Sequence, residues 1–195
     1  MKLKNSVVVV FFLFIGTFAS AQNNYESEHR ILKAQFPEVA TSFVTDNTEH
    51  IKNLKFYKEV DTASTRFSAK FKKDRLKYHM DFDADGALQK IGFQVKVVDL
   101  SSDLYSTVES YFLNNFETFK VKRIFQEYGI ESNRTQSQFL KDAFQNMILP
   151  SNKYRFLIVA KKNGKKTKYD ALFDGEGNLK RLKQSLPANH DRVLY

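Results

Sequence analysis

Apolar and polar residues alternate with a period of two along residues 76–82, where Leu76, Tyr78, Met80 and Phe82 are separated by polar positions. This alternation is typical of a β-strand with one buried face. It returns at residues 91–97, after the run Asp-Ala-Asp-Gly at 83–86. Asp side chains bond nearby backbone amides and Gly adopts the positive φ of tight turns, so the stretch predicts a β-hairpin.

The hairpin stretch at residues 77–88 reads KYHMDFDADGAL, and residues 168–179 echo it as KYDALFDGEGNL. A second echo relates residues 43–47, FVTDN, to residues 111–115, YFLNN. The first echo keeps one constant offset over its twelve positions, and such self-similarity indicates copies of one unit. We therefore predict an α+β fold of two tandem units, each an α-helix packed on a three- to four-stranded antiparallel β-sheet. The units span residues 22–100 and 101–195, and without a Gly-, Pro- or Ser-rich linker their sheets should join or pack closely.

The remaining helices and strands are predicted from the spacing of apolar residues and from residues that typically begin or end a helix or a turn. Residues 28–47 carry apolar side chains at three- and four-residue steps, which predicts a short helix and then a longer one that begins near Pro37. An added amphipathic helix is predicted at residues 136–149, with Pro150 as its stop. Asn163-Gly164 predicts a two-residue hairpin turn. Further strands are predicted at residues 51–60, 65–71, 121–128 and 154–160.

The N-terminus has the three parts of a secretory signal peptide. Lys2 and Lys4 precede an apolar run at residues 7–18, and small residues occupy positions 19–21. The apolar run is shorter than the roughly 20 residues that span a membrane, although an uncleaved anchor is the alternative. We predict cleavage of residues 1–21, export to the periplasm or the medium, and no stable membrane insertion afterwards.

Composition narrows the chemistry that the chain can perform. It has 195 residues, a formal net charge of +9 and no Cys, which excludes disulfides, thiol catalysis and thiolate metal sites. Its 19 Phe and 9 Tyr supply a core that packing alone must stabilise. Most of the excess positive charge lies in residues 101–195, so an acidic partner would meet that half first.

The combination of helix, antiparallel strands, an Asp/Gly turn and a tandem copy behind a signal peptide resembles the PepSY-like secreted proteins of bacteria. The motif is clearest at residues 82–86, FDADG, and its echo at 173–177, FDGEG. Such proteins are sometimes described as similar to β-lactamase-inhibitor proteins. The resemblance implies an exported, non-catalytic binding or inhibitory module. The added helix at 136–149 departs from the family pattern.

Metal binding and catalysis have little support in the sequence. Asp81, Asp83, Asp85 and Gly86 have the spacing of an EF-hand opening, but Gly92 occupies the position of the bidentate Glu and the flanks are strands. The four His residues are far apart and lack metal-site spacing, and no nucleophile-elbow motif occurs. We predict a structural turn, no cofactor, no metal and no enzymatic activity. An unrecognised hydrolase is the least favoured alternative.

The Lys-rich run at residues 161–168 is compatible with a phosphate-binding patch or with charge that protects a strand edge. Stacking aromatic residues are not interleaved with these lysines, so nucleic acid is not a predicted partner. Acidic lipid headgroups or polysaccharide fit an exported protein better.

The polar face of the first predicted sheet is a candidate docking surface, although a solvent-exposed face without a binding function is the simpler interpretation. The predicted function is an exported, non-catalytic module that engages, and in one version inhibits, another envelope or secreted protein. The alternative is an envelope protein that binds a small ligand, a polyanion or a metal ion. His79 is expected to be solvated. The predicted partner-binding residues are Arg66, Lys70, Lys77, His79, Gln94 and Lys96.

Overall fold

The computed structural model describes residues 27–61, 64–131 and 134–185, so the predicted signal peptide lies outside the described residues. Within those ranges no helix is long and apolar enough to cross a membrane. The elements in chain order are β1 (Ser27–Ile31), η1 (Lys33–Gln35), α1 (Glu38–Asn47), β2 (Lys52–Asp61), β3 (Ser64–Lys73), β4 (Leu76–Phe82), β5 (Leu88–Val95), η2 (Val97–Asp99), α2 (Ser102–Asn115), β6 (Thr118–Gly129), α3 (Gln136–Phe144), β7 (Lys153–Lys162), β8 (Lys165–Phe173) and β9 (Leu179–Ser185).

The nine strands of the described residues form one antiparallel sheet in which every strand pairs with its neighbours in the sequence, from β1 to β9. The predicted α+β arrangement of two helix-on-sheet units is therefore wrong. Strand β5 pairs with β6 from Lys90↔Gly129 to Val95↔Ile124, so no boundary divides the sheet. An unpaired strand edge leaves a row of backbone donors and acceptors without partners, and this pairing removes two such edges.

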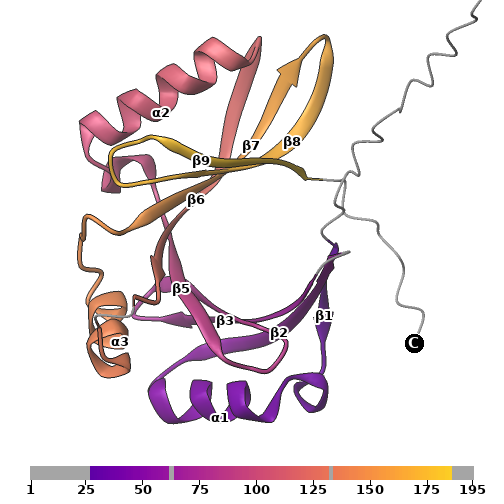
Figure 1. The fold of residues 1–195 in the computed structure, drawn as a ribbon, viewed down its shortest axis with the longest axis vertical. Coiled ribbons are helices and arrows are strands. Elements are labelled where there is room, and N and C mark those ends of the chain that lie inside the picture. The colour runs from indigo at the N-terminus through magenta and orange to yellow at the C-terminus, as the bar shows by residue number, and fades with distance from the viewer. Residues whose placement is uncertain (1–26, 62–63, 132–133, 186–195) are drawn as a thin grey trace, which may run out of the picture.

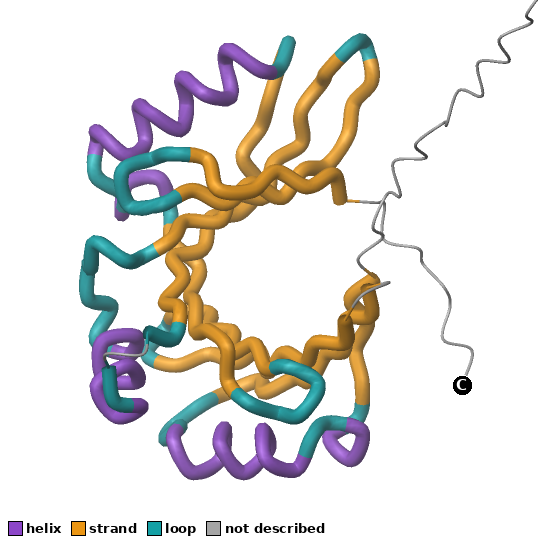
Figure 2. Tube along the Cα trace, in the orientation of Figure 1, coloured by secondary structure: helices purple, strands orange, loops and turns teal. Residues whose placement is uncertain are grey.

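The sheet is strongly curved, and the helices lie on its outer side (Figure 1; Figure 2). Apolar side chains of alternate strand positions point to this outer face and form the core. Phe82 is fully buried beside Phe36 and Phe43, with ring centroids 5.7 and 6.0 Å away. Phe112 of α2 covers the other half of the sheet and packs on Phe173 at 5.5 Å. The opposite face is concave and polar.

The N-terminal prediction is wrong for residues 27–31, whereas a short 3-10 helix, η1, does precede Pro37. Helix α1 begins directly after Pro37, but residues 27–31 form the edge strand β1 instead of a short helix. Strand β1 pairs with β2 from Ser27↔Val60 to Ile31↔Phe56. The backbone hydrogen bonds offered by β2 outweigh the weak helical spacing of this short segment, because local propensity is overridden by tertiary context.

Helix α3 ends at Phe144, five residues before the predicted end at 149. Asn146 has a φ of 56°, and its amide donates to the Ala143 carbonyl, while the Met147 amide donates to the Asp142 carbonyl. These two bonds form a Schellman motif, in which a left-handed residue terminates a helix. The Asn cap, and not Pro150, stops the helix.

The predicted hairpin turns are confirmed. Asp83 Oδ1 accepts from the amides of Asp85 and Ala87 at 3.1 and 2.9 Å. Asp174 Oδ1 makes the equivalent bonds to Glu176 and Asn178 at 3.1 and 2.8 Å in the echoed turn. The Asn163-Gly164 turn has positive φ at both residues, as a type I′ hairpin requires.

Gly177 should be far less tolerant of substitution than Gly164, although both have positive φ, +87° and +74°. A Cβ at Gly177 would lie 2.8 Å from Thr107 Cβ on α2, whereas a Cβ at Gly164 meets nothing within 4 Å. We expect Gly164→Ala to lower the free energy of unfolding by about 1 kcal/mol and Gly177→Ala by about 3 kcal/mol, because crowding adds to backbone strain. Urea denaturation measures both, and equal losses would contradict the contact with α2.

Candidate functional site on the concave face

Five of the six predicted partner-binding residues come from the adjacent strands β3, β4 and β5 and share the concave face. Lys70 of β3 is paired directly with His79 of β4, and Arg66 lies on the same side of β3. Lys77 and Gln94 line a cavity on this face together with Lys70 and His79. Lys96 follows β5 directly and is exposed, but it does not line the cavity. The structure thus gathers five of the six residues around one region, with Lys96 at its border.

The expectation that His79 is solvated is wrong, because its side chain is only 4 % exposed. Its cross-strand neighbour is Gly92, and a Cβ built there would lie 2.4 Å from His79 Cε1. The imidazole therefore occupies the space that any other residue at position 92 would fill. It also meets the Phe125 ring edge-on at 5.3 Å between centroids. The sequence pattern identified the correct face but not this local burial.

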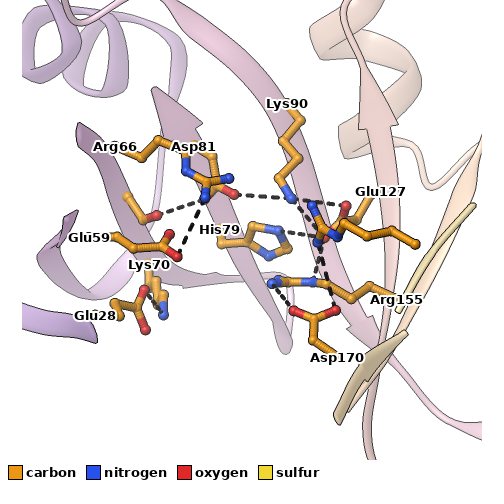
Figure 3. A network of polar contacts seen from close by, with 12 residues as sticks. Glu28, Glu59, Arg66, Lys70, His79, Asp81, Lys90, Glu127, Arg155 and Asp170 are labelled. Atoms are coloured by element: carbon orange, nitrogen blue, oxygen red, sulfur yellow. Dashed lines mark hydrogen bonds and ion pairs between the residues drawn. The ribbon is translucent and has the colours of Figure 1, made fainter. Parts of the chain in front are cut away.

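Glu127 of β6 is the centre of a buried network of charges (Figure 3). Its carboxylate lies 2.7 Å from Arg155 Nε and 3.0 Å from Lys90 Nζ. His79 Nε2 is 3.6 Å away, beyond hydrogen-bonding distance. Arg155 also lies 3.7 Å from Asp170 of β8. The network therefore ties β4, β5, β6, β7 and β8 together across the middle of the sheet.

Mutual attraction keeps these buried groups ionised. Burial alone would raise the pKa of Glu127, but Arg155 and Lys90 outweigh it and hold that pKa well below its usual range. Burial likewise acts against charge on Arg155, yet Glu127 and Asp170 raise the pKa of the guanidinium above its ordinary value. Because a buried charge without a partner is costly, the network is stable only when its members are present together.

The other acidic side chains of the concave face are also paired with basic ones. Asp81 lies 3.3 Å from Lys90 and accepts a hydrogen bond from Ser68 at 2.8 Å. Further along the face, Glu28 pairs with Lys70 at 2.5 Å, and Glu59 pairs with Arg66 at 3.7 Å. The negative charge of this face is therefore neutralised internally, and the charge left over is positive.

The sequence pattern did not identify Glu127, Arg155 or Asp170 as members of the site. They lie on strands that were assigned to a separate unit, and only the β5–β6 pairing brings them next to His79 and Lys90. One signal was present: Arg155 is the only charged residue within the otherwise apolar strand at 154–160. A lone charge in a central strand indicates a buried ionic partner.

The concave face contains a cavity of about 500 Å³ that opens beside His79. His79, Phe125 and Arg155 form part of its lining, and Arg155 stacks over the Phe125 ring at 4.8 Å. No acidic residue belongs to its described lining. The basic residues that line it are Lys55, Lys70, Lys72, Lys77, Arg123 and Arg155.

The Asp-rich turn does not have the geometry of a calcium loop. Asp81 lies on the concave face and pairs with Lys90, whereas Asp83 accepts hydrogen bonds from the turn amides and from Gln89. Their carboxylates are thus directed to different partners. Among the described residues, no three His, Asp or Glu side chains are grouped as metal ligands.

No protein-family model and no curated protein matches the sequence. Several solved structures from Bacteroides do resemble it. A B. eggerthii protein described as periplasmic has a TM-score of 0.51 at 10% identity, covering 76% of this chain and 88% of that chain. A DUF2874 family protein from B. ovatus has a TM-score of 0.49 at 12% identity, covering 82% and 94%. A BLIP-like protein from B. fragilis has a TM-score of 0.46 at 14% identity, covering 82% and 92%.

At these identities the similarity concerns the fold alone. The structural neighbours are described as DUF2874 family, BLIP-like and periplasmic proteins. The PepSY-like resemblance stays a prediction.

Replacing Arg155 with Met should destabilise the protein strongly. The substitution keeps an unbranched side chain but leaves Glu127 and Asp170 without their shared cation, so we expect a loss of about 3–5 kcal/mol in the free energy of unfolding. The matched control is Lys161→Met, which removes an exposed ion pair with Glu117 and should cost under about 1 kcal/mol. Urea denaturation at neutral pH compares them, and similar losses would show that the buried network is not stabilising.

Glu127 should also make stability depend on acidic pH. Its folded pKa is lower than its unfolded value of 4.5, so its contribution is complete above pH 4.5 and is lost as the pH falls towards the folded pKa. Glu127→Gln removes this titration, so the free energy of unfolding should fall less steeply between about pH 4.5 and 2.5. Exposed Glu49→Gln is the control and should keep the wild-type slope. An unchanged slope in Glu127→Gln would contradict the lowered pKa.

Proposed function

We propose that this chain is an exported, non-catalytic binding module whose concave face engages another envelope or secreted protein that presents an acidic surface. The observation that carries the proposal is the charge of this face. Its acidic side chains are paired within the protein, while Lys77, Lys96 and other exposed basic side chains remain available. Charge complementarity accelerates association and excludes partners of like charge.

The sheet also suits protein binding because the helices cover only one of its faces and its strands are firmly linked to one another. All described helices pack on the outer face, so the concave face is covered by none of them (Figure 1). The backbone of β2 to β8 is hydrogen bonded to a neighbour on both sides, and the buried charges around Glu127 link the strands. A surface that changes little on binding loses little conformational entropy.

We further propose that binding inhibits the partner, as the inhibitor-like resemblance of the sequence implies. The proposal of export rests on the N-terminal sequence and on a structural neighbour described as periplasmic.

The proposal predicts that reversing charge on the concave face weakens partner binding. The double variant Lys77→Glu/Lys96→Glu changes two exposed basic residues of this face, whereas Lys33→Glu/Lys141→Glu makes the same charge change on η1 and α3. Residues 22–195 would be immobilised to capture proteins from envelope and medium extracts of the source cells. A partner that free protein competes off should bind the concave-face variant at least about tenfold more weakly.

The control variant should retain that partner. Equal retention by both variants would overturn the assignment of the concave face. If no protein is retained specifically by the wild type, the protein-binding proposal itself fails.

A further inference from the structure

The cavity beside His79 concentrates positive charge that no described residue neutralises. Lys70 is balanced by Glu28, and Arg155 is balanced by Glu127 and Asp170. The remaining basic residues of the lining are exposed and form no ion pair with any described residue. They are Lys55, Lys72, Lys77 and Arg123.

Strand register places these charges unfavourably close together. Lys72 of β3 is directly opposite Lys77 of β4, and Lys55 of β2 is directly opposite Lys70. Like charges at directly opposed positions of an antiparallel pair destabilise the sheet. Glu28 offsets the charge of Lys70, but no acidic residue lines the cavity beside the Lys72–Lys77 pair, so a negatively charged occupant would relieve the repulsion there.

The size and lining of the cavity indicate what this occupant is. A volume of about 500 Å³ is within the range of small-molecule sites and is too small for a folded domain. Lysines bind oxyanions as mobile point charges, and an arginine adds directional bonds to phosphate or carboxylate. The Phe125 ring, held between His79 and Arg155, supplies a preorganised apolar wall. Gln94 and Asn53 add neutral polar groups to the lining.

We propose that this cavity is a binding site for a small organic anion that carries two or more phosphate or carboxylate groups. The unpaired cations hold the anionic groups, and the Phe125 wall contacts the organic portion. The site stands on geometry and charge alone and does not depend on the proposed binding of a protein partner.

Calorimetric titration of residues 22–195 with pyrophosphate and with citrate, at about 150 mM salt, tests the site. The pocket variant Lys55→Gln/Lys72→Gln/Arg123→Gln avoids every residue used to test protein binding. Its matched control, Lys33→Gln/Lys141→Gln/Lys166→Gln, removes the same charge from exposed positions elsewhere. We expect saturable binding of at least one anion, weakened about tenfold or more in the pocket variant and by less than about twofold in the control. Pyrophosphate and citrate distinguish phosphate from carboxylate preference.

The ligand-free pocket variant should also melt at the wild-type temperature or above it, because it loses repulsion and no ion pair. Equal weakening in both variants would reduce the effect to general attraction between a basic protein and anions. The proposal would also be overturned if neither anion binds at concentrations up to about 10 mM, which corresponds to the weakest Kd of interest. Pocket-dependent binding of a hexaglutamate peptide without binding of either small anion would overturn it as well, since the site would then suit an acidic segment of a protein.

Discussion

The antiparallel pairing of β5 with β6 is the constraint on which the rest of the structure depends. The chain between these strands contains η2 and α2, yet the two strands meet in register from Lys90↔Gly129 to Val95↔Ile124. Without this pairing, each half of the chain would end in an unpaired strand with unsatisfied backbone groups. With it, one continuous sheet separates an apolar outer face, which the helices cover, from a polar concave face.

The same pairing explains why the buried charges can exist. Lys90 comes from the first half of the chain, and Glu127 and Arg155 come from the second. Each charge is tolerated in the sheet because a partner from the neighbouring strand compensates for lost hydration. Side-chain packing also joins the two halves of the chain, since Gly92 leaves room for the His79 ring to contact Phe125. The middle of the concave face is thereby held rigid by groups that neither half could supply alone.

The distribution of charge on this face links the fold to the proposed functions. The carboxylates of this face form ion pairs within the protein. Several lysines and Arg123, which lie at the cavity and its border, form no ion pair with a described residue. A protein partner with an acidic surface and a small polyvalent anion are both attracted to such a face. They differ in what they require: the partner needs a broad exposed surface, and the anion needs the group of cations that lines the cavity beside Phe125.

The sequence by itself determined the local features: the strand alternation, the Asp83 and Asp174 turns, the Asn163-Gly164 hairpin, and the face shared by Arg66, Lys70, Lys77 and His79. These features depend on neighbouring residues and on backbone geometry, which sequence periodicity reports directly. Tertiary structure alone decided that β1 is a strand, that His79 is buried, and that the two predicted sheets are one sheet. The physical reason is that a strand with one apolar face has the same pattern whether its edge is open or paired. Which strand it pairs with, and hence which distant charges meet, depends on contacts between residues far apart in the chain.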